Sequence, residues 1–98
     1  MELLWNIYEV ESSKNQLHGI KLRGTIRKFT IENNINCLVE NASDKENVVR
    51  FALLEEKNLE SLLSFINKLI PDAKITLVLN SIPNPVLSKV KVNDLNRY

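Results

Sequence analysis

The chain has 98 residues, of which 44% are hydrophobic, and its 13 Lys and Arg nearly balance its 12 Asp and Glu. This length predicts a single domain, residues 1–98, built around one hydrophobic core. The near-neutral charge argues against a general nucleic-acid or polyanion binder, because such proteins carry a clear basic excess.

Two further features narrow the class of protein. The single cysteine, Cys37, excludes an internal disulfide and a metal site built from cysteines. The sequence from Met1 to Asn6 has neither a basic start nor a long apolar run. We therefore expect no signal peptide and no membrane span, and a cytoplasmic protein.

The first half of the chain predicts a strand, a loop, a helix and a hairpin. Residues 3–10 are rich in strand formers, and their apolar residues fall on both parities, as in a central strand. Residues 11–19 are polar and read as a loop. Residues 21–33 carry apolar side chains at helical spacing. Residues 35–41 alternate between apolar and polar, and residues 48–54 form the next strand of a hairpin.

The second half begins with the strongest helical stripe of the chain, which consists of Leu59, Leu62, Leu63, Ile66, Leu69 and Ile70. We expect Asn58 to cap this helix and Pro71 to end it. Residues 74–80 then predict a strand with Ile75, Leu77 and Leu79 on one face. Residues 81–85 form a loop, and residues 86–92 predict a last strand.

This order of elements is β-α-β-β-α-β plus a short fifth strand. It predicts an α+β fold in which two helices pack on one face of an antiparallel sheet, the ferredoxin-like arrangement. RNA-recognition modules share the order, but residues 47–53 lack the glycine and the spaced aromatic side chains that stack bases. Because this fold hosts many functions, only a specific site can indicate what the chain does.

One such site is suggested by the segment N-Q-L-H-G-I-K-L-R at residues 15–23, followed by L-V-E-N at residues 38–41. These segments resemble the signature of the acylphosphatases, in which a loop G-x-V-Q-G-V-x-F-R ends in an arginine at a helix start and a strand G-W-V-x-N supplies an asparagine. The matching residues are Gly19, Ile20, Leu22, Arg23, Val39 and Asn41. Asn41 lies 18 positions after Arg23, which is the family's usual spacing.

The resemblance implies an acylphosphatase-like fold and a hydrolase that cleaves acyl phosphates to a carboxylate and phosphate, without a metal or cofactor. Loop amides turned inward before a helix can cradle an anion, and an arginine fork can hold two phosphate oxygens. The implied phosphate-binding residues are His18, Gly19, Ile20, Lys21, Leu22 and Arg23. The implied catalytic residues are Arg23, which offsets the negative charge of the phosphoryl group, and Asn41, which orients the attacking water.

The chain also departs from the family pattern. Asn15 replaces the first glycine of the loop, His18 the glutamine, Leu22 the aromatic residue, and Lys45 the glycine of the turn N-x-x-D-G. These departures leave a second function open, a catalytically silent acylphosphatase-like domain that binds an anion or a protein partner. For the hydrolase we expect a monomer that binds a small acyl phosphate or phosphate anion, and neither nucleic acid nor a membrane.

Overall fold

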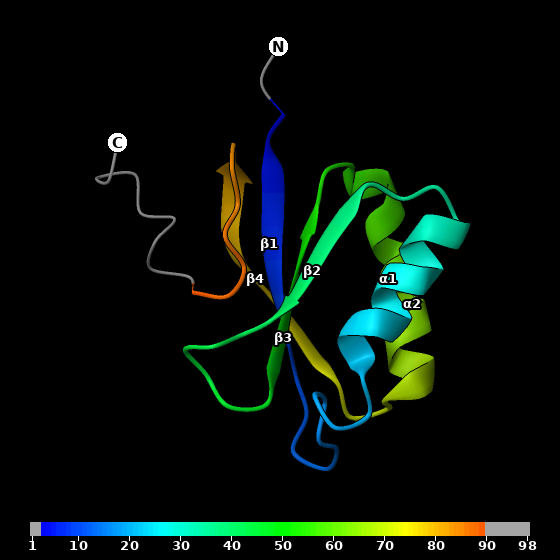
Figure 1. Ribbon diagram of the computed structural model, residues 1–98. Helices are drawn as coiled ribbons and strands as arrows, with labels where there is room; N and C mark the ends of the chain where they lie inside the picture. The colour runs from blue at the N-terminus through cyan, green and yellow to red at the C-terminus, as the bar shows by residue number, and fades with distance from the viewer. Residues whose placement is uncertain (1–2, 90–98) are drawn as a thin grey trace.

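The computed structural model describes residues 3–89, and its elements follow the predicted order β-α-β-β-α-β without the predicted fifth strand (Figure 1). They are β1 (Trp5–Glu11), α1 (Leu22–Glu32), β2 (Cys37–Asn41), β3 (Val48–Leu53), the 3-10 turn η1 (Glu56–Asn58), α2 (Leu59–Leu69) and β4 (Lys74–Ile82). No helix in this part of the chain is long and apolar enough to cross a membrane.

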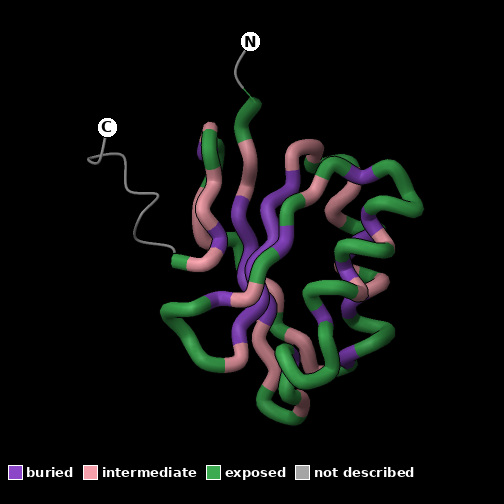
Figure 2. Tube along the Cα trace, viewed as in Figure 1, coloured by how far each residue is buried: buried purple, intermediate pink, exposed green. Residues whose placement is uncertain are grey.

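The strands form one sheet in the order β2-β3-β1-β4, and each neighbouring pair is antiparallel. Both helices lie on the same face of this sheet (Figure 1). The predicted α+β architecture is therefore confirmed, and it is compatible with a ferredoxin-like fold. The central strands β1 and β3 are buried along most of their length, while the outer sides of the helices are exposed (Figure 2).

The main core lies between the helices and the sheet. The helices contribute the buried side chains Leu22, Ile26, Leu62 and Ile66. Phe29 of α1 stacks on Phe65 of α2, with ring centroids 4.0 Å apart. Full burial of an aliphatic side chain such as Leu22 or Ile26 stabilises the fold by about 1.5–3 kcal/mol. This core fixes the position of α1, and hence of the loop before it.

The prediction that Asn58 caps α2 is wrong. The backbone of Asn58 is already helical, with φ −91° and ψ −6°, and its side chain makes no capping hydrogen bond. An N-cap residue normally needs an extended backbone to turn its side chain onto the first free amides. Here the chain is already wound by η1, so Asn58 continues a turn instead of starting one. The predicted helix end is confirmed, because α2 stops at Leu69, two residues before Pro71.

The prediction that Ile75, Leu77 and Leu79 share one face of β4 is wrong. Tyr8 of β1 pairs with Leu77, but the preceding Ile7 pairs with Leu79. One step along β1 therefore spans two residues of β4, which is a β-bulge, and the bulge changes the side to which later residues point. Ile75 packs on the helix side, whereas Leu79 packs on the opposite face.

The predicted last strand is not formed by residues 86–89, and the remainder of that prediction, residues 90–92, lies outside the described residues. Instead, the segment that follows β4 folds over the sheet face opposite to the helices. Leu87 is buried there against Ile7, Ala52 and Ile82. The carbonyl of Ser88 accepts the backbone N–H of Ser43 at 2.8 Å. Burial of Leu87 and the hydrogen bond from Ser43 thus hold this segment in place, without the ladder of a strand.

A buried arginine organises the same face. The side chain of Arg50 has no exposed surface, and its Nε donates to Glu9 Oε2 at 2.8 Å while its Nη1 donates to Asp44 Oδ1 at 2.6 Å. Nη1 also donates to the carbonyls of Leu87 and Ser88, at 3.0 and 3.3 Å. Burial by itself lowers the pKa of Arg50, but the hydrogen bonds and charges of Asp44 and Glu9 raise it above its ordinary value.

We predict that Arg50→Met destabilises the protein by about 3–5 kcal/mol, because Glu9 would be left buried without its main cation. The matched control is Lys45→Met, since Lys45 Nζ also lies 3.1 Å from Glu9 Oε1 but its side chain is 51% exposed. The half-exposed ammonium of Lys45 keeps much of its hydration, so we expect a smaller loss, about 1–2 kcal/mol. Urea denaturation measures both, and equal losses in the two variants would contradict a special role for Arg50.

Candidate functional site

The loop between β1 and α1, residues 12–21, is anchored by Asp72, which lies in the turn after α2. Asp72 accepts hydrogen bonds from Ser12 Oγ at 2.9 Å, from the backbone N–H of Lys14 at 3.2 Å and from Asn15 Nδ2 at 3.2 Å. These bonds, with that from Ser12 as the largest cause, lower the pKa of Asp72 below its ordinary value. The carboxylate thus ties the first half of the loop to the end of α2.

Asn47, which precedes β3, holds the second half of the loop. Its Oδ1 accepts the backbone N–H of Leu17 at 2.7 Å, and its Nδ2 donates to the carbonyls of Ser12 and Asn15 at 3.0 and 2.7 Å. The backbone of Asn47 has φ 53°, a conformation that asparagine tolerates better than most residues. Nothing in the sequence links Asn47 or Asp72 to a loop so distant along the chain, and we did not predict either contact.

Three of the predicted cradle amides are already used inside the loop. The backbone N–H groups of Ile20, Lys21 and Leu22 donate to the carbonyls of Gln16, His18 and Leu17 at 3.0–3.2 Å. Within residues 3–89, the amides of His18, Gly19 and Arg23 donate no hydrogen bond. A bound anion would therefore meet fewer free amides than the resemblance implies.

The side chains of the loop have different surroundings. Leu22 is fully buried and belongs to the main core, whereas Ile20 is half exposed. His18 Nε2 lies 2.9 Å from the carbonyl of Val48, so the ring donates this hydrogen bond from Nε2. Positive φ occurs at Lys21, which precedes α1, and not at Gly19. Leu22 and His18 therefore tether the loop, while Lys21 makes its sharp turn into the helix.

Arg23 lies in the first turn of α1 and reaches the end of β2. Its Nη1 is 3.7 Å from Glu40 Oε2, and both side chains are about half exposed, at 47% and 53%. Exposed pairs at this distance contribute little stability, about 0–1 kcal/mol. The ion pair places the start of α1 one residue away from Asn41, and its weakness leaves Arg23 free to take another anionic partner.

Asn41 is the last residue of β2. Val39 packs into the helix-side core, so Asn41 points to the same side and Glu40 points away, because strand side chains alternate. Asn41 Oδ1 is buried, and it accepts no hydrogen bond from residues 3–89. A buried acceptor without a donor is uncommon and costs about 1–3 kcal/mol, so this oxygen is suited to accept a hydrogen bond from a small donor such as water.

The structure therefore brings Arg23 and Asn41 to the same end of the molecule, but the guanidinium lies toward Glu40 on the other side of β2. The single cysteine, at the start of β2, supplies no nucleophile. Burial raises the pKa of the Cys37 thiol to about 12, so it is not a nucleophile at neutral pH. Among the described residues, no three His, Cys, Asp or Glu side chains gather in a way that could hold a metal ion.

Comparisons of the chain with protein-family models, with curated proteins and with solved structures find no match.

We predict that Asn47→Gly loosens the loop without straining the backbone, since glycine accepts the positive φ and only the three side-chain hydrogen bonds are lost. Hydrogen exchange at the Leu17 amide should accelerate, and stability should fall by about 1–3 kcal/mol. Asn34→Gly is the matched control, because Asn34 also has positive φ (54°) but is exposed and makes no side-chain hydrogen bond within residues 3–89. If both variants leave Leu17 exchange unchanged, Asn47 does not anchor the loop.

Proposed function

We propose that this chain is an acylphosphatase-like domain that hydrolyses acyl phosphates where α1 begins and β2 ends. The observation that carries the proposal is the buried Oδ1 of Asn41, which has no hydrogen-bond partner among residues 3–89 and lies beside a helix whose first turn holds the half-exposed Arg23. The sequence resemblance assigns the chemistry to the same two residues. A five-stranded acylphosphatase arrangement, a monomeric state and a cytoplasmic location belong to the same proposal.

The first step of the proposed reaction is capture of the phosphoryl group. Arg23 exchanges Glu40 for two phosphate oxygens, which its planar fork fits better than it fits a single distant carboxylate oxygen. The unused amides of His18 and Gly19 add neutral donors on the loop side. The N-terminal end of α1 contributes further positive potential.

The second step is attack by water. Asn41 Oδ1 accepts one hydrogen of a water molecule and turns the oxygen lone pair toward phosphorus. A P–O bond forms to this water while the P–O bond to the acyl group breaks, and the acyl oxygen leaves as a carboxylate. The proton of the water passes to a phosphate oxygen of the substrate itself. The step needs neither a covalent nucleophile nor a protein base, which suits a neutral amide at this position.

The backbone amides of Ile20, Lys21 and Leu22 already donate hydrogen bonds within the loop, which limits the affinity for phosphate. They also favour a second candidate, a catalytically silent acylphosphatase-like domain that binds an anion or a protein. In that case Arg23 and Glu40 form a surface ion pair with no catalytic role. The two candidates differ in a measurable way, because only the hydrolase depends on Asn41 for turnover.

The deciding experiment measures phosphate release from benzoyl phosphate in the presence of a chelator. We expect Arg23→Ala to lower kcat/KM by at least about 10²–10³-fold, as for loss of a preorganised charge stabiliser. Asn41→Ala should lower kcat and leave inhibition by inorganic phosphate nearly unchanged, since Asn41 places water and not phosphate. Lys68→Ala, which removes an exposed cation from α2, is the control. Hydrolysis no faster in the wild type than in Arg23→Ala would support the silent domain.

A separate prediction concerns Glu40, whose carboxylate competes with substrate for Arg23. Glu40→Gln removes this competitor and its repulsion of phosphate while keeping the shape of the side chain. We expect KM for benzoyl phosphate and the inhibition constant of phosphate to fall together, by about 2–5-fold for a pair of this strength. A rise in both constants would mean that Glu40 orients Arg23 for binding instead of occupying it.

A further inference from the structure

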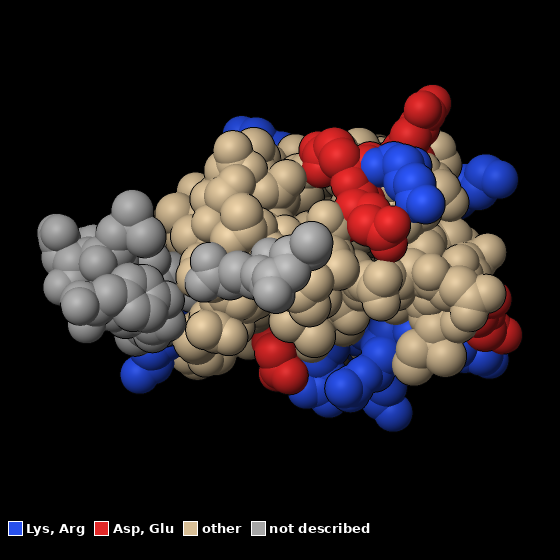
Figure 3. Space-filling view, turned by 90° about the horizontal axis from the view of Figure 1, so that it is seen from above, with Lys and Arg blue, Asp and Glu red and all other residues tan. Residues whose placement is uncertain are grey.

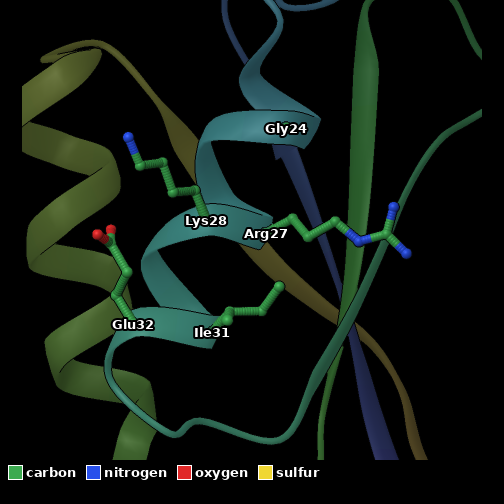
Figure 4. A pocket seen from close by; sticks show the side chains of 5 residues that line it. All are labelled: Gly24, Arg27, Lys28, Ile31 and Glu32. Carbon is green, nitrogen blue, oxygen red and sulfur yellow. The ribbon is translucent and has the colours of Figure 1, made fainter.

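The outer side of α1 carries a groove that the proposed hydrolase does not use. A shallow, open depression of about 310 Å³ is lined by Gly24, Arg27, Lys28, Ile31 and Glu32, all of α1. Arg27 and Ile31 extend to one side of the helix, Lys28 and Glu32 extend to the other, and Gly24 lies one turn above them (Figure 4). Arg27 and Ile31 thus form one ridge, and Lys28 and Glu32 form a second. The groove between these two ridges runs toward Gly24.

Gly24 has no role in the packing of the domain itself. A Cβ atom added at this position would meet no atom within 4 Å, and the backbone of Gly24 has no positive φ. Glycine in a helix weakens it relative to alanine, and no packing contact of the described residues offsets this loss at Gly24. Its missing side chain opens the end of the groove and lets another backbone approach α1 closely.

The charged residues at the two ends of α1 do not stabilise the helix. The first turn contains no acidic residue and the last turn contains no basic residue, the reverse of what the helix dipole favours. Arg27 and Lys28 form no ion pair with the described residues. Seen from above, Lys and Arg side chains form a group at the lower edge of the view, and others lie at the upper edge beside Asp and Glu (Figure 3). Arg27 and Lys28 are thus available to an acidic partner.

The groove also offers an apolar contact. Ile31 is the most exposed large hydrophobic side chain of the described residues, at 69%. The aliphatic stems of Arg27 and Lys28 extend the apolar surface around it, since long basic side chains keep only their ends in water. An exposed isoleucine beside two unpaired cations fits an amphipathic protein segment better than it fits nucleic acid, which has no aliphatic side chain to cover Ile31. Glu32 repels acidic groups, so the carboxylates of the partner belong beside Arg27 and Lys28, one turn closer to Gly24.

We infer that this groove is a docking site for an acidic amphipathic helix of a partner protein. A ridge of the partner helix packs between the two ridges of α1, as in ordinary helix pairs, and comes closest at Gly24. An apolar side chain of the partner covers Ile31, and its flanking carboxylates pair with Arg27 and Lys28. A second copy of this chain fits less well, because a two-fold contact through the groove sets the cations of one copy near those of the other.

The test uses the full chain and two stapled helical peptides that both carry leucines along one face. The glutamate peptide has glutamates on both sides of this face, and the lysine peptide has lysines there. NMR titration should show that the glutamate peptide shifts Gly24, Arg27, Lys28 and Ile31, and that the lysine peptide does not. The double variant Arg27→Glu/Lys28→Glu should weaken the glutamate peptide at least about 10-fold and gain binding to the lysine peptide. Lys68→Glu/Lys74→Glu, which makes the same total charge change in α2 and at the start of β4, is the control.

Gly24→Ala separates docking from folding. We expect it to raise the thermal midpoint by a few degrees, because the added methyl group meets nothing, and to weaken the glutamate peptide at least about 10-fold. A lower midpoint would mean that the fold itself requires glycine, which overturns the inference. Millimolar phosphate should not displace the peptide, since Arg23 lies outside the groove. Failure of the hydrolase assay therefore leaves this result standing.

Other outcomes also overturn the inference. Absence of shifts at millimolar glutamate peptide, or shifts elsewhere on the surface, would exclude the groove as a helix site. Shifts of the groove residues that grow with protein concentration alone would identify a second copy as the occupant. Tighter binding of a single-stranded oligonucleotide to the same residues would identify a polyanion site.

Discussion

The buried guanidinium of Arg50 is the interaction on which the sheet face opposite the helices depends. A charge without exposed surface must be paired and fully hydrogen-bonded, or it destabilises the fold by several kcal/mol. Glu9 from β1 and Asp44 from the β2–β3 turn pair the charge, and with the carbonyls of Leu87 and Ser88 they accept hydrogen bonds from Nε and Nη1. Nη2 makes no hydrogen bond within residues 3–89, although it lies 2.8 Å from Glu9 Oε2 as an ion pair. One side chain of β3 therefore fastens three separate parts of the chain, and the segment after β4 can cover the sheet without forming a strand.

The loop between β1 and α1, at the same end of the sheet, shows the same principle. Asp72 and Asn47 hold residues 12–17 from outside, and the loop then satisfies the amides of Ile20, Lys21 and Leu22 with its own carbonyls. A loop closed in this way is rigid, but fewer of its backbone amides are free to bind an anion. Under the proposed function, binding therefore relies on Arg23, and the weakness of its pair with Glu40 is what keeps it usable.

Helix α1 connects the two proposals while keeping them physically separate. Its inner side, through Leu22 and Ile26, is locked into the core. Its first turn presents Arg23 toward the end of β2, and its outer side presents Gly24 and Ile31 to solvent. A helix held by its inner side tolerates unfavourable residues elsewhere, because tertiary packing supplies most of its stability. That tolerance allows one short helix to carry two different surfaces.

The sequence by itself determined the order of the elements, the central place of β1, the alternation of β2 and the buried stripe of α2, because periodicity is a local property that burial selects. It also singled out Arg23 and Asn41, which the fold brings to one end of the sheet. Only the tertiary structure decided the bulge that turns Leu79 away from Ile75, the burial of Arg50, the anchoring of the loop by Asn47 and Asp72, and the course of residues 83–89. Each of these depends on partners distant along the chain, and a polar residue gives no local sign of whether such a partner will bury it or leave it in water.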